Sequence, residues 1–180
     1  MTRSQLEHLI RASGAIAQDS ELVIIGSQAI LGTDPNPPST LTFSMEADIY
    51  PRTYLQKAAD IDGAIGEGSR FHETYGYYAQ GVSPETATLP SSWRKRLRVI
   101  KGPNTNGVAG YCLDAHDLVL SKYVANREKD LDFNRVVIRH GYVEQQRLLD
   151  LLEEMPVPPA TCDRIRSAID LEFSQLKPVT

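Results

Sequence analysis

The feature that most constrains this chain is an apolar run that stops at a Gly-Ser pair. Residues 22–25 are Leu-Val-Ile-Ile, mostly β-branched, and Gly26 and Ser27 follow directly. Such a run predicts a strand in the core of a sheet, and the Gly-Ser pair predicts a sharp turn into a helix. We therefore expect a sheet in which an early, buried strand ends at a tight turn.

A second strand pattern lies in residues 44–49, where the side chains alternate strictly in character. Successive side chains of a strand point to opposite faces, so Ser44, Glu46 and Asp48 share one face. Two carboxylates side by side on a strand repel each other unless a cation neutralises them. A hard divalent ion such as Mg²⁺ is usually held by one or two carboxylates plus substrate phosphate oxygens. The pair predicts a metal site, and the alternative is an exposed strand whose acids face solvent.

A Gly-Ser turn followed by an acid-x-acid strand resembles the nucleotidyltransferase superfamily. Within it, the chain looks most like the bacterial AbiEii-like group and a related group of uncharacterised domains. The resemblance implies that Gly26 and Ser27 bind the outer phosphates of a nucleotide, and that Glu46 and Asp48 hold Mg²⁺ or Mn²⁺. The chain departs from the usual pattern in three ways: Glu46 replaces the commoner Asp, the insert after the turn is long, and residues 28–31 lack the Arg often found there.

A helical segment further along the chain, residues 113–130, extends the resemblance. Leu118, Lys122 and Ala125 recur at the spacing of one helix face. The segment is similar to the downstream motif of the same superfamily branch, a helix of the form Asp-Leu…Lys…Ala…Arg…Lys-Asp. The resemblance implies that Lys122 approaches the nucleotide phosphates and that Asp130 closes the site. The alternative is a surface helix with solvated charges.

A third carboxylate normally completes a site of this kind, as a ligand or as a base. No acid occurs in residues 94–101 or 108–113, the two predicted strands where one is expected. By resemblance Asp130 takes that place, and Asp114 is the second choice.

The pattern as a whole predicts an α/β (α+β) fold, a nucleotidyltransferase-like mixed sheet flanked by helices. Residues 1–113 form this core, and residues 114–180 form a C-terminal helical region packed on it, so that one structural unit results. The expected helices are 4–18, a short one after the Gly-Ser turn, 53–66, 114–126, 128–140, 143–154 and 160–176. The expected strands are 22–26, 43–49, one within 75–82, 93–101 and 108–113, the last two paired with each other.

Two further patterns suggest contacts with nucleic acid or nucleotide. On a strand, Arg94, Arg96 and Arg98 would share a face and would bind either phosphates, of a triphosphate or an RNA, or acidic side chains of the protein itself. Tyrosines in residues 75–78 predict aromatic packing on the core, with base stacking as the alternative.

Composition narrows the function classes. A net charge of −4 over 180 residues does not indicate nucleic-acid binding by the whole surface. The longest apolar run is far too short for a membrane span, and the N-terminus lacks the apolar core of a signal peptide. Neither the two cysteines nor the four histidines have the spacing of a zinc site. We expect a cytoplasmic protein that does not act in a membrane.

The expected function is transfer of a nucleoside monophosphate from a Mg²⁺-bound NTP to an acceptor, which is an RNA, a protein or a small molecule. The first alternative is a catalytically degenerate nucleotidyltransferase-fold module that binds or regulates, for example with a cognate partner protein in a toxin–antitoxin or phage-defence system. The departures at Glu46 and residues 28–31, and the unassigned third acid, favour it. The second alternative is an RNA- or tRNA-binding protein that uses the arginine run.

Overall fold

The computed structural model describes residues 1–176 and divides into two compact units. Unit 1 comprises residues 1–87 and 97–114, and unit 2 comprises residues 88–96 and the chain from residue 115 onward. Residues 177–180, the end of the predicted helical region, lie outside the described part. The predicted α/β class is confirmed, since unit 1 holds a mixed sheet with helices packed on it.

Unit 1 is built on a five-stranded sheet with the order β3-β2-β1-β5-β4. The strands are β1 (Glu21–Ile25), β2 (Glu46–Pro51), β3 (Tyr78–Gly81), β4 (Arg98–Ile100) and β5 (Ala109–Cys112). The central strand β1 runs antiparallel to β2 and parallel to β5, while β3 is parallel to β2 and β4 is antiparallel to β5. The predicted pairing of the last two strands is therefore confirmed, and the strand that carries the acids lies beside the strand that ends at the Gly-Ser pair.

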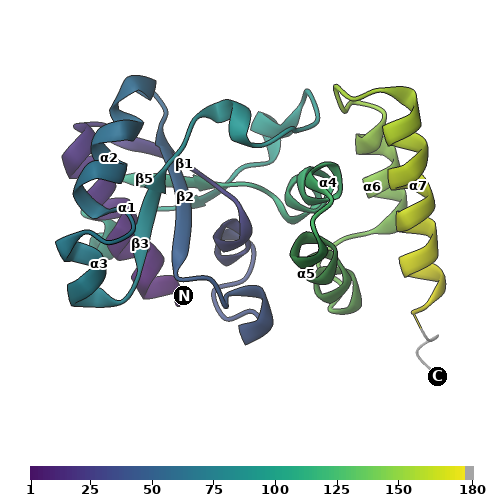
Figure 1. The fold of residues 1–180 in the computed structure, drawn as a ribbon, viewed down its shortest axis with the longest axis horizontal. Helices are drawn as coiled ribbons and strands as arrows, with labels where there is room; N and C mark the ends of the chain where they lie inside the picture. Colours follow the sequence, from purple (N-terminus) through teal and green to yellow (C-terminus); the bar gives the residue numbers. More distant parts are fainter. Residues whose placement is uncertain (177–180) are drawn as a thin grey trace. The chain divides into compact units, whose positions relative to one another are not determined.

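Helices cover one face of this sheet (Figure 1). They are α1 (Arg3–Ala17), α2 (Ala58–Ile65) and the short α3 (Arg70–Tyr75), and a 3₁₀ helix, η1 (Ser27–Gly32), follows β1. The start of α1 has a capping box, in which Thr2 and Gln5 satisfy each other's backbone N–H groups. On β2, Ala47 and Ile49 are fully buried, and the alternation leaves the intervening acids on the other face.

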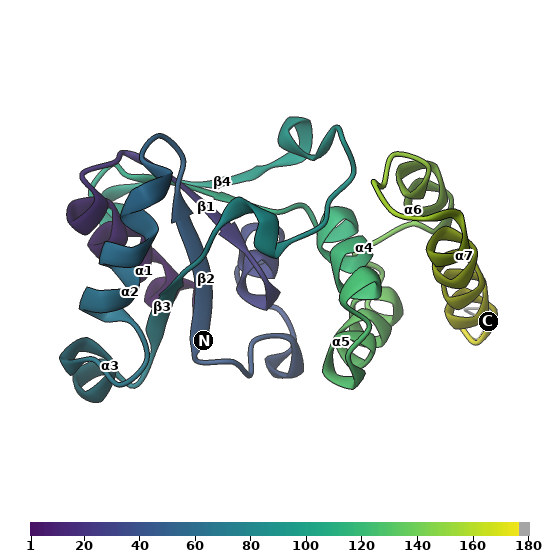
Figure 2. The same cartoon turned by 45° about the horizontal axis from the view of Figure 1, so that its top comes forward.

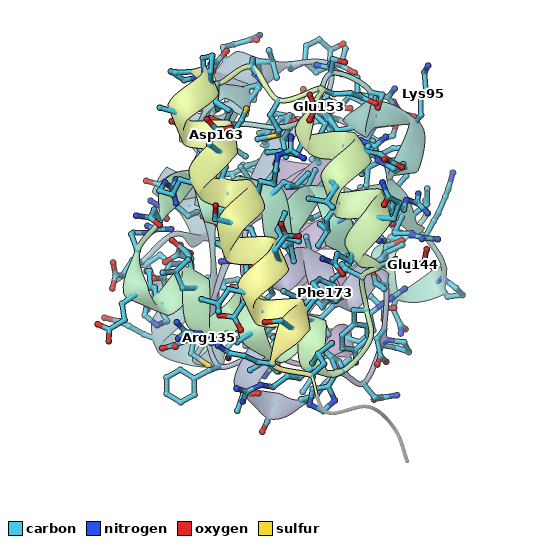
Figure 3. The ribbon with its side chains drawn as sticks, turned by 90° about the vertical axis from the view of Figure 1, so that its right-hand side faces the viewer. Lys95, Arg135, Glu144, Glu153, Asp163 and Phe173 are labelled. Carbon is cyan, nitrogen blue, oxygen red and sulfur yellow. The ribbon has the colours of Figure 1, made fainter. Side chains whose placement is uncertain are left out.

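Unit 2 consists of helices and the segment 88–96. Its helices are α4 (Ala115–Ala125), α5 (Glu128–Arg139), α6 (Gln145–Leu152) and α7 (Pro159–Ser174). The helices α4 and α5 lie side by side (Figure 2), and α6 and α7 are also neighbours (Figure 3). Arg135, labelled in Figure 3, joins α5 to α7 through an ion pair with Glu172.

The structure corrects two sequence predictions. Residues 93–96 form a 3₁₀ helix, so the strand predicted over 93–101 is reduced to β4. Residues 70–75 form the helix α3, which the sequence reasoning missed, because six residues are too few to show a helical period. Among residues 1–176, no helix has both the length and the apolar character needed to cross a membrane.

Candidate functional site

The Gly-Ser turn and the acid-bearing strand meet at the end of β1. Ile25, the last residue of β1, pairs with Asp48 across the antiparallel ladder. The next residue, Gly26, has φ +70°, a conformation that residues with a Cβ rarely adopt. A Cβ built on Gly26 would lie 2.0 Å from Oδ2 of Asp48. The Asp48 carboxylate therefore lies directly against the backbone of the turn, and both the backbone conformation and the close approach require glycine.

Glu46 lies on the same face of β2 as Asp48 and is held by a tyrosine. Glu46 pairs with Tyr78 in the parallel β2–β3 ladder, and the Tyr78 hydroxyl donates a 3.0 Å hydrogen bond to Oε2 of Glu46. Burial, this hydrogen bond and the charges of Glu46, Glu67 and Asp48 together raise the pKa of Tyr78 to about 12. Tyr78 is therefore protonated at neutral pH and acts as the donor to the carboxylate.

A hydrogen bond from a buried side-chain amide links the helical turn after Gly26 to the segment that leads into β2. Gln28, in η1, is 1% exposed, and its Nε2 donates a 3.1 Å hydrogen bond to the carbonyl of Ser44. The Ser44 hydroxyl in turn accepts a hydrogen bond from the backbone N–H of Glu46 (3.1 Å). A residue in the helical turn after Gly26 thus fixes the strand that carries the acids. Of the predicted phosphate-binding residues, Ser27 is the first residue of η1.

In unit 2, the partly buried Lys122 forms an ion pair with the buried Asp130. Lys122 Nζ lies 3.0 Å from Oδ1 of Asp130 and 4.5 Å from the centre of the Phe133 ring. Arg127 donates to both Asp130 oxygens, at 2.6 and 3.3 Å. Burial alone would raise the pKa of Asp130, but the hydrogen bonds from Arg127 and Lys122 outweigh it and hold the pKa below its usual value. Asp130 thus fixes the position of two cationic side chains.

Both candidates for the third carboxylate, Asp130 and Asp114, are already paired with cationic side chains. Both oxygens of Asp130 accept hydrogen bonds from cations. Asp114 is 2% exposed, and its Oδ2 accepts hydrogen bonds at 3.1 and 2.8 Å from the guanidinium of Arg98. Within residues 1–176 there is no group of three or more His, Cys, Asp or Glu side chains arranged to hold a metal ion. A metal at Glu46 and Asp48 therefore needs oxygen ligands from a substrate or from water.

The two carboxylates of β2 fit a divalent cation of this kind. They lie on one face of one strand, and one of them, Asp48, is pressed against a glycine turn. Mg²⁺ is commonly bound by one or two carboxylates, with phosphates and water completing its shell. The donor set matches that mode and does not match an all-protein cage.

The prediction that Arg94, Arg96 and Arg98 share one face of a strand is wrong. Arg96 lies in the 3₁₀ helix and makes a bidentate pair with the fully buried Asp117, at 3.0 and 2.6 Å. Arg98 lies on β4 and pairs with Asp114, while Arg94 stacks on the ring of Trp93. The alternative, pairing with acids of the protein itself, applies to two of the three arginines.

Sequence reasoning missed Tyr78, which it grouped with the other tyrosines of residues 75–78 as core or stacking residues. Tyr77 does face the interior, where its hydroxyl lies 2.7 Å from Nδ1 of His8. Tyr78 has the opposite parity on the strand and therefore faces the side of Glu46. The parity is visible in the sequence, but the partner strand and its register are not.

A family model described as "Nucleotidyltransferase of unknown function (DUF6036)" matches residues 4–167. The chain belongs to this family. The match spans both the β2 acids and the Lys122–Asp130 pair, and it confirms the nucleotidyltransferase resemblance that the sequence suggested. A search of curated proteins and a search of solved structures gave no match. The closer likeness to the AbiEii-like group stays a prediction.

Proposed function

We propose that the protein transfers a nucleoside monophosphate from a Mg²⁺- or Mn²⁺-bound NTP to an acceptor hydroxyl, on RNA, protein or a small molecule. One observation carries the proposal: the Asp48 carboxylate lies against the Gly26 turn, on the strand face that also presents Glu46. Family membership supports the reaction class.

In this proposal the residues of unit 1 bind and orient the nucleotide. Glu46 and Asp48 hold the divalent cation, which when bound neutralises charge on the phosphate oxygens. The Gly26 backbone and the Ser27 hydroxyl contact the outer phosphates, because a tight glycine turn presents N–H groups to anions. The acceptor oxygen forms a bond to the α-phosphorus as the bond to the pyrophosphate oxygen breaks. Catalysis of this kind consists mostly of positioning and electrostatic stabilisation.

Lys122 is proposed to balance negative charge on the nucleotide phosphates. This role rests on the resemblance; within unit 2, Asp130 and the Phe133 ring hold the ammonium group in place. Asp130 is proposed as a positioning residue for Lys122 and Arg127, because its oxygens are already bound by these two cations.

The test is transfer of label from α-phosphate-labelled NTPs to total RNA or total protein, with and without Mg²⁺. Asp48→Asn keeps the shape of the side chain and removes its charge. Loss of one well-placed electrostatic group of an active site costs about 10²–10³ in rate. Label transfer that survives in Asp48→Asn at the wild-type rate would contradict the assignment.

A catalytically degenerate module is the second candidate. The engagement of Asp130 and Asp114 by cations favours it, because the described residues then offer only two carboxylates for the metal. This candidate predicts no Mg²⁺-dependent NTP binding and no transfer to any acceptor. A regulatory role with a cognate partner protein, as in toxin–antitoxin or phage-defence pairs, would then explain why the fold is retained.

A further inference from the structure

The Tyr78 hydroxyl contacts one oxygen of the Glu46 carboxylate, and the sheet fixes this contact. Tyr78 and Glu46 are register partners in the parallel β2–β3 ladder, so their side chains leave the same face of the sheet. The hydroxyl lies 3.0 Å from Oε2 and donates to it. The contact therefore engages Oε2 and restricts the rotation of a side chain that is otherwise flexible.

The Tyr78 ring is itself braced by α3. The His72 ring lies 4.6 Å from the Tyr78 ring, tilted by 48°. The backbone N–H of Gly68 donates a 3.1 Å hydrogen bond to Nδ1 of His72, and Ser69 caps the N-terminus of α3. A chain of contacts thus runs from the start of α3 through two aromatic rings to the acid.

A hydrogen-bonded carboxylate is a better metal ligand than a mobile one. Outer-shell partners orient ligating groups, and their removal typically costs about 10- to 100-fold in metal affinity or activity. The hydroxyl engages Oε2 of Glu46, and a carboxylate has a second oxygen that can face a cation.

We propose that Tyr78 is a positioning residue that orients Glu46 toward a divalent cation, with the His72 ring as its support. The tyrosine hydroxyl restricts the flexible side chain of Glu46. This inference rests on the proposed function, because it assumes that Glu46 is a metal ligand.

The experiment is Mn²⁺ binding, measured by electron paramagnetic resonance on wild type and Tyr78→Phe without nucleotide turnover. We expect Tyr78→Phe to bind Mn²⁺ about 10- to 100-fold more weakly, because the ring is kept and only the hydroxyl is lost. Tyr77→Phe is the matched control. It also removes one tyrosine hydroxyl from neighbouring sequence, but that hydroxyl contacts His8, and we expect wild-type Mn²⁺ affinity.

A double-mutant cycle separates positioning from a general effect on folding. In a Glu46→Gln background the hydroxyl has no carboxylate to orient, so adding Tyr78→Phe should change Mn²⁺ affinity less than twofold. Equal Mn²⁺ affinity of wild type and Tyr78→Phe would overturn the role of Tyr78 and leave the proposed function standing. The same weakening in both backgrounds would also overturn it. Wild-type protein that binds no Mn²⁺, alone or with NTP, would overturn both.

Discussion

Substituting alanine for Gly26 perturbs the contact on which the candidate site depends. The added Cβ would lie 2.0 Å from Oδ2 of Asp48, whereas ordinary contacts begin near 3.4 Å, so the two groups must separate by about 1.4 Å. The backbone of residue 26, with φ 70° and ψ −172°, lies in a region that is essentially restricted to glycine, and a residue with a Cβ there costs about 1–3 kcal/mol of backbone strain. The atom that collides with the new Cβ is at the end of the Asp48 side chain. We therefore expect the carboxylate to rotate away while the β1–β2 pairing is kept.

The expected result of Gly26→Ala is therefore a folded protein with a displaced ligand. A misplacement of about 1 Å in a catalytic arrangement can cost about 10²-fold in rate. The melting temperature should fall by about 2–12 °C, since about 1–3 kcal/mol of strain corresponds to about 2–4 °C per kcal/mol for a chain of this size.

Gly107→Ala provides the matched control for this substitution. Gly107 also has a positive φ, of 77°, but a Cβ there meets nothing within 4 Å, so the variant carries the strain without the collision. Both variants should lose stability in thermal denaturation because both strain the backbone, and only Gly26→Ala should lose nucleotide transfer. Retention of wild-type transfer by Gly26→Ala, or equal loss in both variants, would refute the argument that the turn and Asp48 form one site.

Three more outcomes are expected. Asp130→Asn should lower the free energy of unfolding by about 2 kcal/mol in urea denaturation, because it leaves the partly buried Lys122 ammonium without its carboxylate; a change below about 1 kcal/mol would contradict this. In acid, the pKa of Asp130 is below its usual value, so its contribution to stability is present above pH 3.8 and is lost as the pH falls through the lower, folded-state pKa; Asp130→Asn should reduce this acid sensitivity. In alkali, the raised pKa of Tyr78 means that the folded state keeps a proton the unfolded state loses, so stability should fall between about pH 10 and pH 12, and less so in Tyr78→Phe.

Local patterns predicted the elements that carry the β2 acids and the turn. The apolar run of residues 22–25 and the alternation of residues 44–49 each identify a strand. A nucleotide site needs the carboxylates of the second strand close to the turn that ends the first. The structure pairs these strands and brings Asp48 against Gly26. These patterns were sufficient because each strand shows its signal within a few residues, as an uninterrupted, mostly β-branched run in one and as strict alternation in the other.

What the sequence did not reveal depends on partners distant in the chain. Residues 93–96 alternate as a strand does, but Arg96 is committed to Asp117, 21 residues away, and the segment forms a 3₁₀ helix. The contact of Tyr78 with Glu46 needs the register of β3 on β2, which no local signal encodes. Tertiary contacts of this kind override local propensity.

The central claim is that Glu46 and Asp48 bind a metal-bound nucleotide, and calorimetric titration of the protein with NTPs tests it most directly. We expect NTP binding that requires Mg²⁺ and is abolished by EDTA. In Asp48→Asn binding should be at least tenfold weaker, while the melting temperature stays equal or rises, since the repulsion between the two carboxylates is relieved. NTP binding that is the same with and without Mg²⁺ and unchanged in Asp48→Asn, or no NTP binding by the wild type, would contradict it.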